Sequence, residues 1–230
     1  MPQNNVVELR QYTLYGGKRD VLIELFEREF VEPQNALGAR VLGSFRDLDD
    51  PDRFVWLRGF DSMEARAEAL TAFYDGPIWR THRTAANATM VDSDNVLLLR
   101  RVGDEVGPSA GRGGIFTAHV HYLGPTPPVL FAEVFDRALR PRLADLGATP
   151  FATFMTETTA NSFPRLPVRG GDPVFVWLAG WADERAAAAF ETSFARLSGW
   201  RDAVPAAALP ALMRKPERLR LAPTEASALR

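Results

Sequence analysis

The sequence has no cysteine and only three histidines, and it contains no long apolar run. The absence of cysteine excludes disulfides, thiolate nucleophiles, thiolate-bound zinc and cysteine-ligated iron–sulfur clusters. No apolar stretch approaches the roughly 20 residues that a membrane-spanning helix needs, and the first residues do not resemble a secretory signal. We therefore expect a cytoplasmic protein without a membrane partner.

An excess of one charge is also absent. The chain has 27 Lys and Arg against 29 Asp and Glu, a net charge of −2 at pH 7. A nucleic-acid binder usually shows a basic excess on one face, so no nucleic-acid partner is expected. Hydrophobic residues at 46% and charged residues at 24% are typical of a globular chain, and 230 residues allow one large domain or two small ones.

An internal repeat organises the chain. The segment Phe54–Phe60 (FVWLRGF) reappears as Phe175–Trp181 (FVWLAGW) at an offset of 121. Extended without gaps to Arg80 and Arg201, the alignment has eleven identities in 27 positions. Two related units in tandem are therefore predicted.

The upstream halves of the two copies align at a different offset. Residues 20–46 match 129–155 at an offset of 109, so the second copy carries twelve additional residues. These fall within Thr158–Pro173, which is rich in Pro, Gly, Ser and Asn. Since insertions are tolerated best in surface loops, we expect a surface loop here.

A glycine-rich segment separates the copies. Residues 103–114 contain five glycines in twelve positions, the composition of a flexible linker. The repeat thus predicts a first unit over 1–102, a linker over 103–114, a second unit over 115–221 and a frayed tail over 222–230.

Each copy has the order strand, helix, strand, strand, helix, strand. This β-α-β-β-α-β order defines a ferredoxin-like α+β unit, whose antiparallel sheet carries helices on one face. The bare faces need cover, so we expect the two sheets to pack face to face as an α+β barrel within one chain. A homodimer through the helical faces stays open. The first copy is predicted as strand Val6–Leu14, helix Lys18–Val31, strands Ala39–Arg46 and Arg53–Phe60, a helix capped by Asp61, a short helix from Ile78, and strand Asn95–Val102.

Side-chain alternation assigns residues to the two faces of each strand. In the first strand, Glu8, Arg10 and Tyr12 share one face, while Val7 and Leu9 share the other. We expect the apolar pair to face the helices and the polar set to face the partner sheet. The matching positions of the second copy are Thr117, His119 and His121. The same alternation points Phe54, Trp56, Arg58, Phe60, Phe175, Trp177 and Trp181 into the barrel.

The expected cavity has aromatic walls and a few polar groups, which is typical of a site for a small hydrophobic molecule. No glycine-rich phosphate loop follows a strand, so a nucleotide cofactor is not expected. We predict no tightly bound cofactor.

The first copy contains a series of short motifs: Glu8-Leu9-Arg10-x-Tyr12, Gly38, the Trp56 strand, Asp61-Ser62-x-x-x-Arg66, Trp79 and Asn95-Val96-Leu97. In this order, the motifs resemble the NIPSNAP domain, a member of the dimeric α+β barrel superfamily. The resemblance covers residues 6 to about 101 and weakens over 115–221. It implies the fold more than a chemistry, because the wider superfamily includes cofactor-free monooxygenases, polyketide cyclases, haem-degrading enzymes and muconolactone isomerase-like proteins. Arg66 and Trp79 belong to the pattern, and we interpret both as structural.

His119 and His121, two residues apart on one strand face, allow three interpretations. They could bind a metal, but a site needs a third or fourth ligand and no third histidine lies nearby in the sequence; no metal site is predicted. They could be buried histidines bonded to backbone or water. They could also perform acid–base chemistry, because histidine titrates near neutral pH.

The other candidates also keep two interpretations each. Arg10 is either an anchor for an anionic ligand or the ion-pair partner of Glu8. Tyr12 is a wall residue or a proton donor, and the tryptophans are core or cavity wall. We assign catalysis to His119, His121 and Tyr12, and substrate binding to Arg10, Glu8, Trp56, Arg58 and Trp177.

The leading functional hypothesis is a small-molecule enzyme that works without a cofactor. It would act on a hydrophobic substrate by proton transfer, in a cyclisation, an isomerisation or a cofactor-free oxygenation. The alternatives are a non-catalytic ligand-binding or stress-response module of the NIPSNAP type and a haem-binding protein with a histidine ligand.

Overall fold

The computed structural model describes residues 4–103, 114–171, 173–197 and 204–229. The chain divides into two compact units, which do not coincide with the two sequence repeats. The first unit comprises Met1–Arg101, Glu157–Gly170 and Ala222–Leu229, and the second comprises Val102–Thr156 and Gly171–Leu221. Except for Gly103 and Gly114, the segment predicted as a linker lies outside the described residues.

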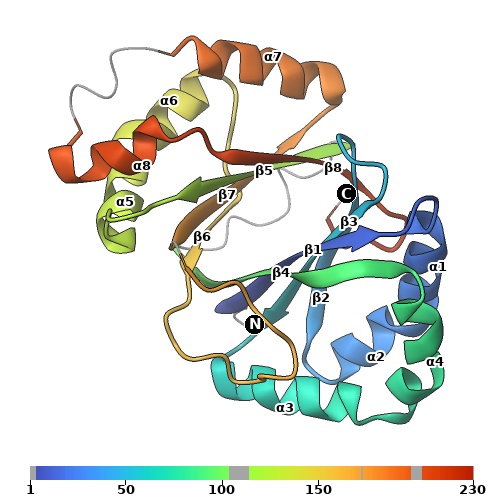
Figure 1. Ribbon diagram of the computed structural model, residues 1–230. Helices are drawn as coiled ribbons and strands as arrows, with labels where there is room; N and C mark the ends of the chain where they lie inside the picture. Colours follow the sequence, from blue (N-terminus) through green and yellow to red (C-terminus); the bar gives the residue numbers. More distant parts are fainter. Residues whose placement is uncertain (1–3, 104–113, 172, 198–203, 230) are drawn as a thin grey trace. The chain divides into compact units, whose positions relative to one another are not determined.

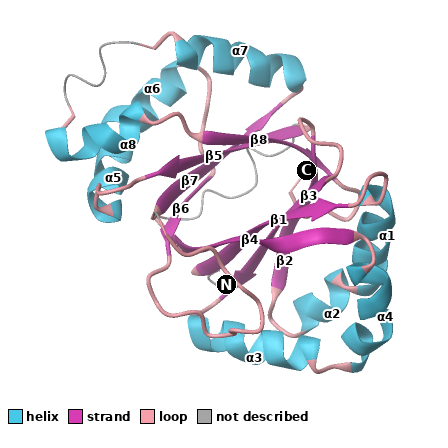
Figure 2. Ribbon diagram, in the orientation of Figure 1, coloured by secondary structure: helices cyan, strands magenta, loops and turns pink. Residues whose placement is uncertain are grey.

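The first unit contains one antiparallel sheet with helices on one face (Figures 1 and 2). Its strands pair in the order β4-β1-β3-β2. The elements are β1 (Val6–Leu14), α1 (Arg19–Glu29), α2 (Val31–Ala36), β2 (Arg40–Asp47), β3 (Arg53–Phe60), α3 (Met63–Tyr74), α4 (Pro77–Asn87) and β4 (Met90–Arg101).

The second unit repeats this plan. Its strands pair in the order β6-β7-β5-β8, again antiparallel. The elements are β5 (Ile115–Tyr122), α5 (Pro128–Val134), a π-helical turn η2 (Phe135–Leu139), α6 (Arg140–Asp145), β6 (Ala152–Thr156), β7 (Val174–Trp181), α7 (Glu184–Ala195), a 3₁₀ turn η4 (Ala206–Ala208), α8 (Leu209–Met213) and β8 (Glu217–Pro223).

The prediction of an α+β fold built from two ferredoxin-like units is confirmed, because each set of elements follows the β-α-β-β-α-β order. Of the helices in the described segments, none is long and apolar enough to cross a membrane.

Local signals recur at equivalent positions of the two units. Gly38 and Gly147, 109 residues apart, both have positive φ values, of 85° and 83°, and end a helix in the left-handed conformation that glycine tolerates best. Ser62 caps α3 by accepting a hydrogen bond from the Ala65 amide at 3.1 Å. Asp183, 121 residues later, caps α7 in the same way. The predicted cap at Asp61 is therefore wrong by one residue.

The predicted orientation of the strand faces is also wrong, in both units. In the first unit, the Trp56 ring lies 4.7 Å from Phe26 of α1, and Glu8 binds Arg66 of α3. In the second unit, His121 contacts Phe131 of α5, and Trp177 contacts Phe190 of α7. The polar and aromatic sets therefore face the helices, while aliphatic side chains such as Val7 and Leu9 occupy the opposite face.

The reason for the reversal lies in the burial of both faces. Val7 and Leu9 on one face and Glu8 and Arg10 on the other are all at most 1% exposed. Alternation then shows which residues share a face, but it does not distinguish a solvent-exposed face from a buried one. The pattern of polar and apolar residues therefore cannot show which face packs against the helices.

Two segments expected at the surface or in a tail are built into the first unit. Within the inserted loop, Phe163 is buried and stacks on Tyr74 with ring centroids 5.8 Å apart. Residues 222–229 do not fray, because the Thr224 amide donates to the Ser44 carbonyl at 2.9 Å, and Ser227 is fully buried. Both segments therefore complete the first unit.

Candidate functional site

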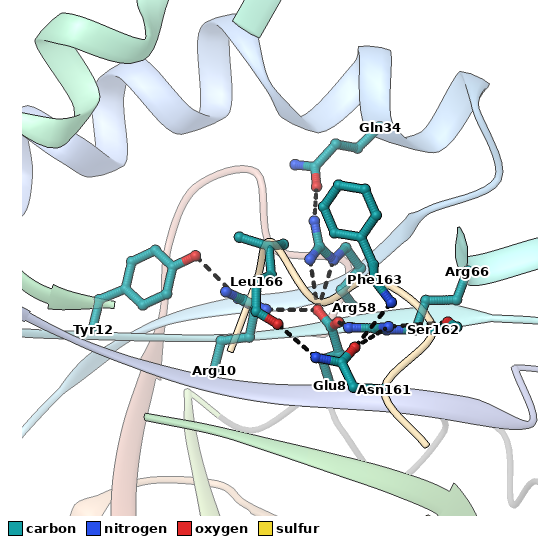
Figure 3. A network of polar contacts seen from close by, with 10 residues as sticks. All are labelled: Glu8, Arg10, Tyr12, Gln34, Arg58, Arg66, Asn161, Ser162, Phe163 and Leu166. Carbon is teal, nitrogen blue, oxygen red and sulfur yellow. Dashed lines mark hydrogen bonds and ion pairs between the residues drawn. The ribbon is translucent and has the colours of Figure 1, made fainter. Parts of the chain in front are cut away.

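A closed ionic network lies under the helices of the first unit (Figure 3). Its centre is the carboxylate of Glu8, to which three arginines donate. Arg10 Nη1 lies 2.8 Å from Oε2, Arg58 Nη2 lies 2.6 Å from Oε2, and Arg66 Nε lies 2.8 Å from Oε1. The side chains of all four residues are at most 1% exposed.

Each of the three guanidinium groups also donates a hydrogen bond to a residue other than Glu8. Arg10 Nε donates to the Tyr12 hydroxyl at 3.0 Å, and Arg58 Nη1 donates to Gln34 Oε1 at 2.7 Å. Arg66 Nη1 donates to Asn161 Oδ1 at 2.9 Å, so the inserted loop seals the network (Figure 3). Arg10 is thus the ion-pair partner of Glu8, and Arg66 links helix to sheet.

The electrostatics of this network follow from its composition. Burial alone would raise the pKa of the Glu8 carboxyl, but the three guanidinium charges outweigh burial and hold that pKa well below its usual range. The Trp56 ring lies against two of the cations, 4.9 Å from Arg58 and 5.5 Å from Arg10. Glu8, Arg10, Tyr12 and Arg58 therefore form a buried network of paired groups, with the Trp56 ring packed against it.

The second unit has a cavity of about 610 Å³ in the region that corresponds to this network. His119 and His121 of β5 line it, together with Glu191 of α7 and Arg218 of β8. The remaining lining is mostly apolar. It consists of Leu139, Phe194, Ala195, Leu197, Leu212, Met213, Pro216 and the cations Arg214 and Lys215.

His119 belongs to a short row of charged and aromatic groups. Its ring stacks on Trp177 with centroids 3.9 Å apart and an interplanar angle of 3°. Its Nε2 lies 3.2 Å from Glu191 Oε1, and Glu191 Oε2 lies 3.2 Å from Arg218 Nη1. Burial lowers the pKa of His119, and Glu191 opposes part of that shift. Burial would raise the pKa of Glu191, but His119 and Arg218 together lower it.

His121 has a different environment from His119. Its Nε2 accepts a hydrogen bond from Trp177 Nε1 at 3.2 Å, which fixes the proton of the neutral ring on Nδ1. Burial, with a smaller effect of His119, lowers the pKa of His121 to about 3. A ring with that pKa is neutral at pH 7 and cannot donate a proton there as an imidazolium. Of the two histidines, His119 is the better candidate for proton transfer, because it contacts a carboxylate; the catalytic role of His121 stays a prediction.

The titration of His121 predicts a pH-dependent stability. The pKa of the folded state lies below the ordinary value of about 6.5, so the unfolded chain binds more protons below that pH. The resulting stability is complete above pH 6.5 and is lost as the pH falls toward 3, at about 1.4 kcal/mol for each pKa unit. We expect thermal melts to decline from pH 7 to pH 5, and His121→Gln, which keeps an acceptor for Trp177, to weaken that decline. An equal decline in wild type and His121→Gln would contradict this assignment.

Sequence reasoning missed Glu191 and Arg218. A signal for Glu191 was present in the repeat, since position 191 aligns with Leu70 at the offset of 121. Leu70 is a fully buried core residue of α3, and a carboxylate at a core position of the second copy indicates a special environment. Arg218 lies in the last strand, where the repeat gave no comparable signal.

The helices beside the cavity contain a local irregularity. Between α5 and α6, residues Phe135–Leu139 form the π-helical turn η2, and Leu139 lines the cavity. Such turns are rare and occur frequently at functional sites. Over the described part of the chain, no cluster of three or more metal-ligating side chains occurs.

The fold and the site define a ferredoxin-like α+β protein with a ligand-sized cavity in its second unit. Residues 7–102 match the model of the NIPSNAP family, which confirms the resemblance of the first copy to a NIPSNAP domain. No curated protein matches the chain.

Solved structures resemble either the whole chain or its first part. An anthrone oxidase-like protein is 16% identical, with 98% of this chain and 94% of that one covered and a TM-score of 0.57. A proposed monooxygenase from Lactobacillus acidophilus is 10% identical, with 95% and 93% covered and a TM-score of 0.56. A NIPSNAP family protein from Agrobacterium tumefaciens is 23% identical over 40% of this chain and 83% of that one, with a TM-score of 0.37. The two longer matches share the fold over nearly the whole chain.

Proposed function

We propose that the second-unit cavity binds a hydrophobic small molecule and that His119 and Glu191 accept a proton from it. The observation that carries the proposal is the contact of 3.2 Å between His119 Nε2 and Glu191 Oε1 at the wall of an otherwise largely apolar cavity. Each of the two groups can accept a proton, and each shifts the pKa of the other across this contact. Such a pair suits removal of a proton from a weakly acidic C–H or O–H.

The proposed proton transfer breaks one bond of the substrate. The bond between the substrate's acidic hydrogen and its carbon or oxygen breaks, and its electron pair stays on the substrate as an enolate or phenolate. The proton goes to Glu191, whose side chain is 19% exposed, while that of His119 is 1% exposed. His119 behind Glu191 positions the carboxylate, and the nearby Arg218 guanidinium favours its charged form.

The contrast between the two units supports a ligand site in the second. At the positions of His119 and Glu191, the first unit has Arg10 and Leu70. There the space under the helices is filled by the Glu8 network, whose members are fully buried.

The comparisons suggest a finer hypothesis about the reaction. Two of the structural neighbours that match nearly the whole chain are named as a monooxygenase and an anthrone oxidase-like protein. In such a reaction, dioxygen would be the oxidant of a ring CH₂: both C–H bonds break, one oxygen atom enters the ring as a C=O group, and the other leaves as water with the two hydrogens. Oxygenation without a cofactor is therefore the form of proton-transfer chemistry that we favour.

The test uses anthrone, a tricyclic ketone with an acidic ring CH₂. In deuterated buffer without oxygen, exchange at that carbon is followed by NMR with wild type, Glu191→Gln, His119→Gln and the control Glu133→Gln, an exposed carboxylate on α5. We expect Glu191→Gln to lose about 10²–10⁴-fold in exchange rate while still binding anthrone, and His119→Gln to lose less.

Unchanged exchange in Glu191→Gln at full occupancy would contradict the proton-transfer role. Binding without exchange in wild type would favour the non-catalytic module instead. With air admitted, oxygen uptake that depends on Glu191 would support the oxygenation hypothesis.

A further inference from the structure

We propose that the ligand of the second-unit cavity carries a carboxylate, which binds to the cationic rim formed by Arg214, Lys215 and Arg218. The inference rests on the proposed function, because it names the class of ligand for the same cavity. The ligand would be an aromatic or polycyclic carboxylic acid, with the ring system in the cavity and the acid group at the rim.

The charges of the cavity lining carry the argument. Among the described residues that line the cavity, Arg214, Lys215 and Arg218 are cations and Glu191 is a carboxylate. Burial lowers the pKa of both histidines. The described lining thus has three cations and one carboxylate, in a chain whose net charge is −2. A cavity wall of one sign attracts ligands of the opposite sign.

The cations are gathered on one segment rather than scattered. All three lie within residues 214–218, between the end of α8 and the start of β8, while the apolar lining includes Leu139, Phe194 and Leu212. The cavity is thus amphipathic, with a charged edge and an apolar body. A neutral hydrocarbon would make no electrostatic contact with the charged edge.

Two contacts hold this edge in place. The Arg214 guanidinium carbon lies 4.7 Å from the centre of the Tyr122 ring, and the Tyr122 hydroxyl donates to the Glu217 carboxylate. Arg218 is already oriented by Glu191 at 3.2 Å. Since Arg218 lies beside the carboxylate that accepts the proton, the same cation can bind the acid group of a ligand and orient its ring toward Glu191.

The experiment compares 2-naphthoate with 2-naphthamide, which have the same ring and differ in charge. Binding to the full-length protein is measured by calorimetry at low and moderate salt, with wild type, Arg214→Gln/Lys215→Gln and the single variant Lys215→Gln. Arg142→Gln, an exposed cation on α6 outside the cavity lining, is the matched control.

We expect naphthoate to bind wild type about tenfold or more tightly than naphthamide. Salt should weaken naphthoate binding only. The preference should disappear in the double variant, shrink in Lys215→Gln and persist in Arg142→Gln.

The outcomes separate the two proposals. If both probes bind wild type equally well, the carboxylate inference is wrong and the apolar cavity stands. If the preference persists in both rim variants, the rim does not recognise the acid and the inference is likewise wrong. If neither probe binds and anthrone does not bind either, the inference and the proposed function fail together.

Discussion

Glu8→Gln is expected to destabilise the first unit by about 3–5 kcal/mol, although glutamine has nearly the same shape as glutamate. The substitution leaves Arg10, Arg58 and Arg66 buried without their common counter-charge. All three guanidinium groups contact the Glu8 carboxylate within 2.8 Å, and none of the side chains is more than 1% exposed. Desolvated cations without a partner are among the most costly arrangements in a protein interior.

The measurement is a thermal or denaturant melt of Glu8→Gln beside wild type and Glu24→Gln. Glu24 also pairs with an arginine, but its side chain is 77% exposed, so its loss should cost less than about 1 kcal/mol. Because the pKa of Glu8 is depressed in the folded state, its contribution is complete above the unfolded value of about 4.3. It should be lost only as the pH falls below that value. A Glu8→Gln protein as stable as Glu24→Gln at pH 7 would show that the network does not hold the first unit together.

The repeat in the sequence predicts the fold well because the repeated residues are ones that mark strands, turns and helix ends. The FVWL strands, the positive-φ glycines Gly38 and Gly147 and the caps before α3 and α7 recur at fixed offsets. Each of these signals is local, so it needs no knowledge of the partner elements. The α+β class and the order of elements follow from them.

The site was harder to predict because the role of each polar side chain depends on contacts with residues that are distant in the sequence. Glu8 binds Arg66, 58 residues away, and Arg66 binds Asn161 in the inserted loop. Alternation along β1 and β5 grouped Glu8 with Arg10 and His119 with His121, and both groupings hold. The face that meets the helices could not be deduced, because both faces are buried. A comparison of Leu70 with Glu191 would have singled out the carboxylate that lines the cavity of the second unit.

The tryptophans at the centre of each unit give the last prediction. Trp56 and Trp177 are 2% and 0% exposed and occupy equivalent positions of the repeat. Truncation of a buried tryptophan to alanine costs about 3–5 kcal/mol, which lowers the melting temperature of a chain of this size by about 6–20 °C. We expect Trp56→Ala and Trp177→Ala both to melt within this range below wild type. Tyr15→Ala, which truncates an aromatic ring that is 55% exposed, serves as the control.

The two substitutions should differ in what else they remove. Trp56→Ala removes the ring against which Arg10 and Arg58 lie, so its effect should be confined to stability. Trp177→Ala removes the ring that stacks on His119 and donates to His121, so it should also slow anthrone exchange in the protein that remains folded below the transition. Trp177→Phe keeps a ring beside His119 and lacks only the indole N–H, so we expect it to recover most of the stability and part of the exchange. Melting temperatures of the alanine variants close to that of Tyr15→Ala would show that neither tryptophan is a core residue, and full exchange activity in Trp177→Ala would separate the stacked histidine from the chemistry.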